Sequence, residues 1–205
     1  MFDRFRQKFD RTPPGQAERV PPGQYVTEKF PVLHYGDVPK YKDLEKTWDL
    51  RVWGEIEQEK TFSFAEFRAL PTVTITIDIH CVTRWSKFDT QWQGVRFRDF
   101  LAHISPLKPN AQFLLAHSEQ GFTANVPLEI MQDDNALLAY KFDDKELDPE
   151  HGFPLRLFVP HKYFWKSAKW LRGLEFLTHD RLGFWERYGY SNNADPWKEE
   201  RYTDD

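Results

Sequence analysis

The stretch Thr72–Gly94, TVTITIDIHCVTRWSKFDTQWQG, decides how the chain folds around its only cysteine. Its first half alternates between polar and apolar side chains, and the apolar ones are Val73, Ile75, Ile77 and Ile79. This period of two predicts a strand with one face in a core. Cys81 falls on the apolar side of the alternation, and a mixture of donors, cations and an indole follows at Thr83–Lys87. The sequence therefore predicts a thiol at the end of a buried strand, at the mouth of a site.

Cys81 has competing interpretations. A single cysteine beside a strand is commonly a small buried hydrophobe. A cysteine nucleophile needs a base within hydrogen-bond reach, but adjacent side chains of a strand point to opposite faces, so His80 is a poor base for this thiol. A structural zinc site is disfavoured, because the chain has no second cysteine and no histidine pair at finger-like spacing. The remaining chemical role is a single protein ligand to a metal whose other ligands come from an organic cofactor.

Three stretches carry a resemblance: DIHCVTRWSKFDTQWQGV from Asp78, HSEQGFTANVPLE from His117 and HGFPLRLFVPHKYFWKSAKWLRGLEF from His151. They resemble the sulfite oxidase family of molybdopterin-dependent oxidoreductases, in particular small stand-alone bacterial members related to the catalytic subunit of the periplasmic methionine sulfoxide reductase. The resemblance covers about residues 30–177, and the aromatic tail is typical of the small subfamily. It implies an α+β, sulfite oxidase-type domain that binds Mo-molybdopterin, with Cys81 as the metal ligand.

The same resemblance assigns the site residues. The positions that match cofactor-binding residues of the family are His34, Asp37, Val38, Ser118, His151, Arg156, Ser167, Ala168 and Lys169. Cys81, as a thiolate, would tune the metal. Arg84 is the catalytic candidate beside it, together with Lys87, because cations there would stabilise the charge of the metal centre and of an anionic substrate.

One long stretch carries no acid. Between Glu150 and Glu175 there is no Asp or Glu, whereas seven basic residues occur, namely His151, Arg156, His161, Lys162, Lys166, Lys169 and Arg172. A solvated basic face is one interpretation. Aromatic residues are interleaved with the basic ones, however, at positions 163–165 and 170, which favours a packed loop. The stretch therefore predicts an anion site, and phosphate is the expected anion.

Composition bounds the class of protein. The 205 residues are 40% hydrophobic and 17% aromatic, enough for one domain with a sizeable core. A net charge of −4 argues against a general nucleic-acid binder. A single cysteine excludes an intramolecular disulfide, and Met1–Asp10 lacks the apolar segment of an export signal. No run reaches the roughly 18 apolar residues of a membrane span. We therefore expect a cytoplasmic protein without a membrane span.

The chain in order predicts an extended arm over residues 1–24 and a single domain over residues 25–205. The arm contains PPG twice, and FDRFRQKF within it suits a short amphipathic turn. Strands are expected at 48–54, 72–81, 112–117, 137–142 and 155–159, and short helices at 63–70, 97–104 and from Asn125. Strands and short helices intermix without a βαβ rhythm, which favours the α+β class.

Oxygen-atom transfer is the function that the resemblance implies, with a lean to reduction of an S- or N-oxide over oxidation of a sulfite-type oxyanion. The alternatives are a non-catalytic molybdopterin-binding or storage module and an interaction domain built on the aromatic and basic residues. No stretch supplies haem or iron–sulfur ligands, so a separate electron-transfer partner is expected. The dimerisation domain of eukaryotic sulfite oxidases is absent, which favours a monomer. The tail is expected to clamp the domain, or to cover the cofactor, through Phe184, Trp185, Tyr188, Tyr190 and Trp197.

Overall fold

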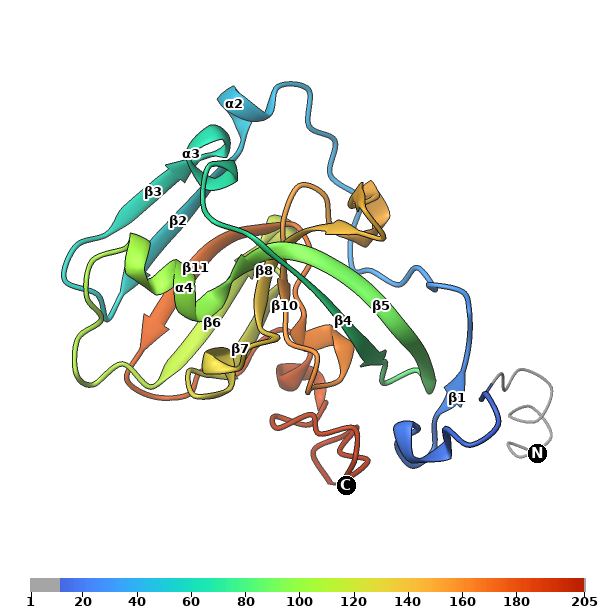
Figure 1. Cartoon of the computed structure of the whole chain (residues 1–205). Coiled ribbons are helices and arrows are strands. Elements are labelled where there is room, and N and C mark those ends of the chain that lie inside the picture. Colours follow the sequence, from blue (N-terminus) through green and yellow to red (C-terminus); the bar gives the residue numbers. More distant parts are fainter. Residues whose placement is uncertain (1–11, 205) are drawn as a thin grey trace.

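The computed structural model describes residues 12–204, which form two mixed β-sheets with a few short helices (Figure 1). The first sheet has the order β1 (Tyr25–Val26), β5 (Trp85–Arg96), β8 (Leu137–Phe142) and β10 (Arg156–Phe158), with β4 (Val73–His80) paired to β5 and β9 (Lys145–Glu146) paired to β8. The second has the order β3 (Lys60–Ser63), β2 (Asp49–Gly54), β11 (Leu171–Leu177), β6 (Phe113–Ser118) and β7 (Thr123–Pro127). The predicted α+β class is confirmed.

The helices are short. The α-helices are α2 (Leu44–Thr47), α3 (Phe64–Arg68) and α4 (Phe97–Phe100). Single 3₁₀ turns lie at Ala17–Arg19, Leu101–His103, Glu119–Gly121, Ile130–Gln132, Pro149–His151, Phe164–Lys166 and Glu186–Tyr188. The capping box predicted before α3 is present, since Ser63 Oγ accepts from the Glu66 amide at 3.2 Å and the Glu66 carboxylate accepts from the Ser63 amide at 2.8 Å. The helix predicted after the cysteine loop is α4 with the following 3₁₀ turn.

The helix predicted from Asn125 is wrong, because this residue lies in strand β7, paired antiparallel with β6. Its polar side chain is buried, yet it is satisfied by contacts remote in sequence: the amide donates to Asp180 and to Asn192, each at 2.7 Å. A buried polar residue with such partners is compatible with a strand. The local sequence did not reveal those partners.

Strand β4 bears out the alternation that predicted it. Ile79 and Cys81 are buried in a cluster around Trp92, and the earlier apolar residues of the strand pack against the same cluster. The loop after Cys81 is shorter than predicted, since β5 begins at Trp85. Backbone hydrogen bonds close it: the Cys81 amide donates to Trp85 O and the Arg84 amide to Cys81 O, both at 2.9 Å. The thiol therefore sits on a tight turn between two paired strands.

A second, larger cluster lies between the sheets and unites them. It includes Val95 and Leu138 of the first sheet with Leu50, Leu114 and Leu174 of the second. The smaller cluster around Trp92 takes the alternate residues of the same strands, such as Leu137 and Phe158, and so lies on the other face of the first sheet. Cys81 belongs to this smaller cluster.

Both ends of the described chain run along the surface. In the arm, Arg19 pairs with Asp78 at 2.6 Å and with Asp89 at 2.7 Å, while the predicted amphipathic turn lies outside the described residues. The tail crosses beneath the sheets at the bottom of Figure 1. Phe184 is buried, but Tyr188 and Trp197 are 69% and 50% exposed, so these two residues do not clamp the domain as predicted.

Candidate functional site

A cavity of about 350 Å³ opens where β4 ends. Its walls come from residues 30–35 after the arm, the cysteine turn, the 151–170 stretch and the tail at residues 185–190, with Phe122 beside them. The volume lies in the range of ligand pockets, and most of the lining is apolar. Segments far apart in the sequence therefore converge on the single cysteine.

The thiol of Cys81 faces this cavity from a largely buried position. Burial raises its pKa, which a hydrogen bond from Thr83 Oγ1 to Sγ at 3.2 Å partly opposes. His80 does not act on the thiol: its Nδ1 lies 2.8 Å from Ser86 Oγ, and burial lowers its pKa to about 4. Within residues 12–204 no three His, Cys, Asp or Glu side chains converge as metal ligands. The turn therefore offers one soft ligand and no general base.

Arg156 is a buried cation at the cavity wall, with 2% of its surface exposed. Its Nη1 donates to His151 O and its Nη2 to Ser167 O, both at 2.8 Å, and the guanidinium lies 4.3 Å from the Phe164 ring centre. Its Nε has no hydrogen-bond partner among the described residues, and none of their carboxylates pairs with it. Burial lowers its pKa to about 9. This positive charge is left without an anion.

Two more basic side chains surround Arg156. Lys169 Nζ donates to Leu33 O and Glu150 O at 2.7 Å each, and burial together with Arg156 lowers its pKa to about 7. His151 is neutral at pH 7, because burial and then the charges of Arg156 and Lys169 lower its pKa to about 4. Basic groups that depress one another mark a place suited to an anion.

Two further cations of the basic stretch are paired with carboxylates. Lys166 pairs with Glu186 at 2.6 Å, and Arg172 pairs with Glu119 at 2.8 Å and also with Asp49. Only part of the predicted anion site therefore faces the cavity. Of the seven basic residues only His161 is exposed, and the others are buried or half-buried, so the exposed basic face that an interaction domain requires is not formed.

An uncharged aromatic wall forms another part of the cavity. It consists of Tyr35, Phe122, Trp165, Trp185 and Tyr190, and ring contacts connect it: Tyr190 lies 5.3 Å from Trp165 and 5.1 Å from Trp185. Cys81 lines the same cavity as the basic cluster and the aromatic wall. The sequence predicted that Trp185 and Tyr190 clamp the domain or cover the cofactor, and both line the cavity. Tyr35 and Phe122 were not singled out as site residues.

Comparison with known proteins identifies the chain. A family model described as "Oxidoreductase molybdopterin binding domain" matches residues 35–185. The chain belongs to this family. The molybdopterin oxidoreductase is 49% identical over 188 residues to the oxidoreductase YuiH of Bacillus subtilis (strain 168), covering 92% of this chain and 94% of YuiH. It is 25% identical over 172 residues to MsrP of Campylobacter jejuni, the catalytic subunit of a protein-methionine-sulfoxide reductase, covering 74% of this chain and 58% of MsrP.

The relatives confirm the predicted cofactor and class of enzyme. Sulfite oxidase of Arabidopsis thaliana is 24% identical and covers 90% of this chain and 55% of the plant protein. The sulfane dehydrogenase SoxCD of Paracoccus pantotrophus superposes with a TM-score of 0.66 at 20% identity over 80% of this chain and 46% of that one, a likeness that concerns the fold. The chain is a molybdopterin-dependent oxidoreductase, and its cofactor is Mo-molybdopterin.

Several predicted site residues of this oxidoreductase lie outside the cavity lining. Arg84 turns away, since its backbone adopts a φ of 76° and its Nη1 lies 3.4 Å from Glu199. Lys87 donates to Glu28 O at 2.8 Å. Ser118 is buried at the end of β6 and its Oγ has no hydrogen-bond partner among the described residues. These placements remove the predicted cations from the cavity.

Of the predicted cofactor-binding residues in the loop before α2, one lines the cavity and two do not. His34 lines the cavity, and its Nδ1 lies 2.8 Å from Gly36 O. Asp37 and Val38 do not line it, and the Asp37 backbone is bonded to the Gln120 side chain instead. Of the predicted cofactor-binding residues, the cavity therefore brings together His34, Cys81, His151, Arg156, Ser167, Ala168 and Lys169.

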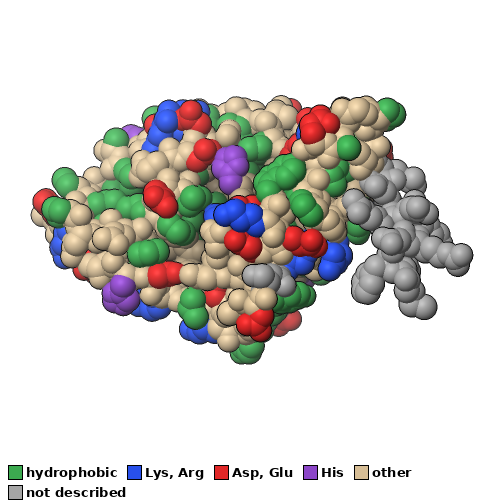
Figure 2. Space-filling model, turned by 90° about the horizontal axis from the view of Figure 1, so that it is seen from below, with side chains coloured by type: hydrophobic (Ala, Val, Ile, Leu, Met, Phe, Trp, Pro, Cys, Tyr) green, Lys and Arg blue, Asp and Glu red, His purple; other side chains and the backbone are tan. Residues whose placement is uncertain are grey.

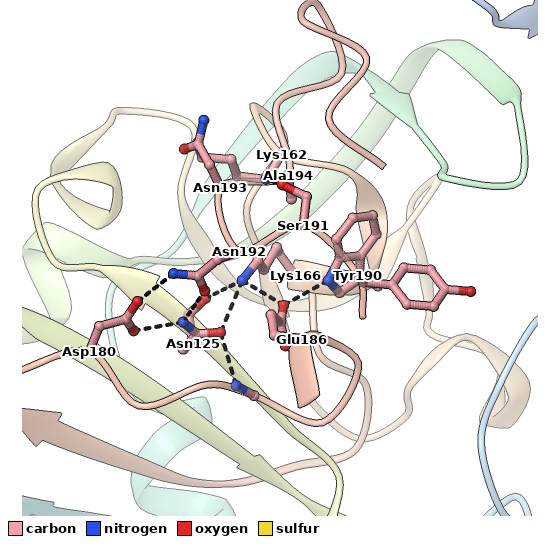
Figure 3. A network of polar contacts seen from close by, with 12 residues as sticks. Asn125, Lys162, Lys166, Asp180, Glu186, Tyr190, Ser191, Asn192, Asn193 and Ala194 are labelled. Carbon is pink, nitrogen blue, oxygen red and sulfur yellow. Dashed lines mark hydrogen bonds and ion pairs between the residues drawn. The ribbon is translucent and has the colours of Figure 1, made fainter. Parts of the chain in front are cut away.

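A buried polar network anchors the aromatic wall (Figure 3). Lys166 Nζ lies 2.6 Å from Glu186 Oε1 and donates to Asn125 O and Oδ1 at 3.0 Å each. The indole of Trp165 donates to the same Glu186 oxygen at 2.8 Å. Because Glu186 sits beside Trp185 in the tail, this ion pair fastens the tail to the basic stretch and fixes the wall.

The face that carries the tail is mixed in charge. Figure 2 shows acidic and basic side chains interspersed with hydrophobic ones over this face, without a continuous field of one sign. Such a surface lacks the basic stripe that binds nucleic acid. In the part of the chain that the structure describes, no helix has both the length and the apolar character needed to cross a bilayer.

Proposed function

We propose that the cavity holds the phosphate of molybdopterin at Arg156, Lys169 and His151 and the metal at Cys81. One observation carries this proposal: the buried guanidinium of Arg156 has a free Nε and no carboxylate partner among residues 12–204. A buried charge is costly unless it is paired, so this cation fits an anion that a ligand brings. Charge-assisted hydrogen bonds to phosphate would satisfy it. The residues present therefore fit the cofactor.

Each residue around the cavity has a distinct task. When bound, the cofactor supplies oxygen-atom transfer coupled to a two-electron change of molybdenum. Cys81 would hold the metal as a thiolate. Because burial raises the pKa of the free thiol, the positive charge of the metal would favour release of the thiol proton to solvent. Thr83 donates to the sulfur and orients it. The aromatic wall excludes water and contacts the substrate.

We propose that the substrate is an uncharged S- or N-oxide that is reduced. The support is the aromatic part of the cavity lining, together with the placement of Arg84 and Lys87 outside the lining. The two cations that do line the cavity, Arg156 and Lys169, are assigned to the phosphate. An oxyanion such as sulfite would require cationic donors there. The reaction consumes two electrons and two protons per oxide, releases the reduced compound and water, and takes its electrons from a separate electron-transfer partner.

Turnover assays test this function. The protein would be purified from a host that makes molybdopterin, and its molybdenum measured. Rates with reduced viologen and aryl or alkyl sulfoxides and N-oxides would be compared with sulfite oxidation by a dye acceptor. We expect faster oxide reduction. Faster sulfite oxidation would overturn the direction, and full molybdenum content without turnover in either direction would instead support a storage module.

A further inference from the structure

The two ends of the described chain meet at the backbone of the cysteine turn. Gln24 Nε2 donates to Cys81 O at 3.0 Å, and Arg201 Nη1 donates to Val82 O at 2.6 Å. The Tyr25 amide donates to Arg84 O at 2.9 Å. Three carbonyls of a four-residue turn are thus bonded by groups that are at least 57 positions away in the sequence.

Arg201 is placed as a buried bridge rather than as a surface cation. Only 3% of it is exposed, and its guanidinium lies 4.9 Å from the Tyr163 ring centre. Besides Val82 O, it contacts Pro22 O at 3.4 Å and Glu199 at 3.2 Å. Burying a guanidinium is costly, and here its donors are directed to the turn and to the arm that supports the turn.

The segment that carries Arg201 is itself fastened to the core (Figure 3). Asn193 accepts from Lys162 Nζ at 2.6 Å, and Asn192 donates to Asp180 at 2.6 Å. The Ser191 amide donates to the Arg201 carbonyl at 3.1 Å. The position of the guanidinium is therefore tied to the same network that holds the aromatic wall.

Gln24 approaches the turn from the other side and is fully buried. It precedes β1, whose two residues pair in parallel with Trp85 and Ser86 at the start of β5. This pairing fixes Gln24 in register with the residues just after the turn. The arm and the tail therefore reach consecutive carbonyls of one turn from opposite ends of the chain.

We propose that Gln24 and Arg201 are positioning residues that hold the cysteine turn in the conformation in which Cys81 presents its sulfur to the cavity. The idea rests on the proposed function only in that Cys81 is taken as the metal ligand. If these residues only stabilise the fold, their loss should lower global stability without a selective rise in amide exchange at the turn. If they position the turn, their loss should selectively raise amide exchange at the turn and change the spectrum of the metal.

The test uses Arg201→Met, which keeps the length but removes the donors, with Arg201→Lys as the conservative variant and Gln24→Leu as the independent second variant. Arg187→Met, an exposed arginine of the same tail outside the cavity lining, is the matched control. Hydrogen exchange of the Cys81, Arg84 and Tyr25 amides is measured on cofactor-free protein. The electron paramagnetic resonance spectrum of Mo(V) is measured on the loaded protein.

We expect the turn amides of Arg201→Met and Gln24→Leu to exchange roughly tenfold faster or more, which corresponds to one lost hydrogen bond to a charged or buried group. The Mo(V) signal should shift or split, Arg201→Lys should recover part of both effects, and Arg187→Met should match the wild type. Unchanged turn exchange and an unchanged Mo(V) signal, with only a lower melting temperature, would overturn the proposal. Absence of molybdenum from wild-type protein would defeat the proposed function, while exchange in cofactor-free protein would still decide on the positioning role.

Discussion

Arg156→Met tests the phosphate site through a difference between two forms of the protein. The substitution keeps the side-chain length but removes the charge and every donor, including the Nε that has no partner among the described residues. A charge-assisted hydrogen bond contributes about 1.5–3 kcal/mol. The variant should therefore bind the cofactor roughly ten- to a hundredfold more weakly.

The same loss should appear as a smaller gain of thermal stability on cofactor binding, since a ligand that binds only the folded state stabilises it by mass action. For a chain of this size, about 2–4 °C per kcal/mol implies that the difference in melting temperature between loaded and cofactor-free protein shrinks by roughly 3–12 °C. The substitution also leaves the His151 and Ser167 carbonyls unpaired, which lowers the melting temperature of the loaded and of the cofactor-free variant alike. The difference between these two melting temperatures is therefore free of this effect.

Calorimetry and molybdenum analysis of both forms provide the assay. Arg51→Met is the matched control, because Arg51 is an exposed arginine of β2 that pairs with Glu59 and lies outside the cavity lining. Its gain on cofactor binding should equal that of the wild type. If Arg156→Met retains full molybdenum and the complete stability gain, the guanidinium does not bind the phosphate and the reasoning is refuted.

The remaining predictions concern pH, the buried ion pair and the aromatic wall. The pKa of Lys169 is lowered to about 7 in the cofactor-free fold, so between pH 7 and 9 the unfolded chain binds more protons than the folded one. The stability of the cofactor-free protein should therefore rise over this range. Cofactor affinity should fall over the same range, because Lys169 loses its positive charge. Titration of both quantities should show a smaller slope in Lys169→Met, and an equal slope would contradict the assignment. Lys166→Met leaves the Glu186 carboxylate buried without its cation and should lower the free energy of unfolding by about 3–5 kcal/mol, measured with denaturant. Adding Glu186→Leu should recover much of this loss. No recovery would argue against the ion pair as the cause. Trp165→Leu should raise KM for aryl oxides about two- to tenfold through the lost ring contact, whereas an unchanged KM would remove Trp165 from the substrate wall.

Local patterns predicted five of the eleven strands among residues 12–204, namely β2, β4, β6, β8 and β10, and missed the other six, including the long strand β5 and β11. The alternation through Ile79 predicted β4, and the capping box at Ser63 predicted α3, because both signals depend on neighbours within a few residues. The polar partners of Asn125 come from the tail, so the sequence around it was misread as a helix start. Its strand is fixed by tertiary contacts, which single-sequence patterns do not contain.

In the site, too, some features follow from local sequence and others depend on tertiary contacts. Cys81 and the basic residues around Arg156, which motifs and an acid-free stretch had predicted as site residues, line one cavity. Arg84 lies outside the cavity lining in a tight turn where its φ is 76°, and the motif does not specify the direction of its side chain, so its catalytic role stays a prediction. The roles of Tyr190 and Arg201 depend on where the tail crosses the domain, a consequence of the buried network rather than of local sequence.

The most direct test of the central claim is the molybdenum–sulfur coordination of wild type and Cys81→Ser, measured by X-ray absorption on protein from a host that makes molybdopterin. The account predicts close to one molybdenum per chain in the wild type. In Cys81→Ser it predicts one sulfur ligand fewer and lost turnover, with the cofactor largely retained by the basic cluster, because a hydroxyl is a poor substitute for a thiolate on a soft metal position. The same number of sulfur ligands in both proteins, with undiminished turnover in the variant, would contradict the assignment of Cys81 as the metal ligand.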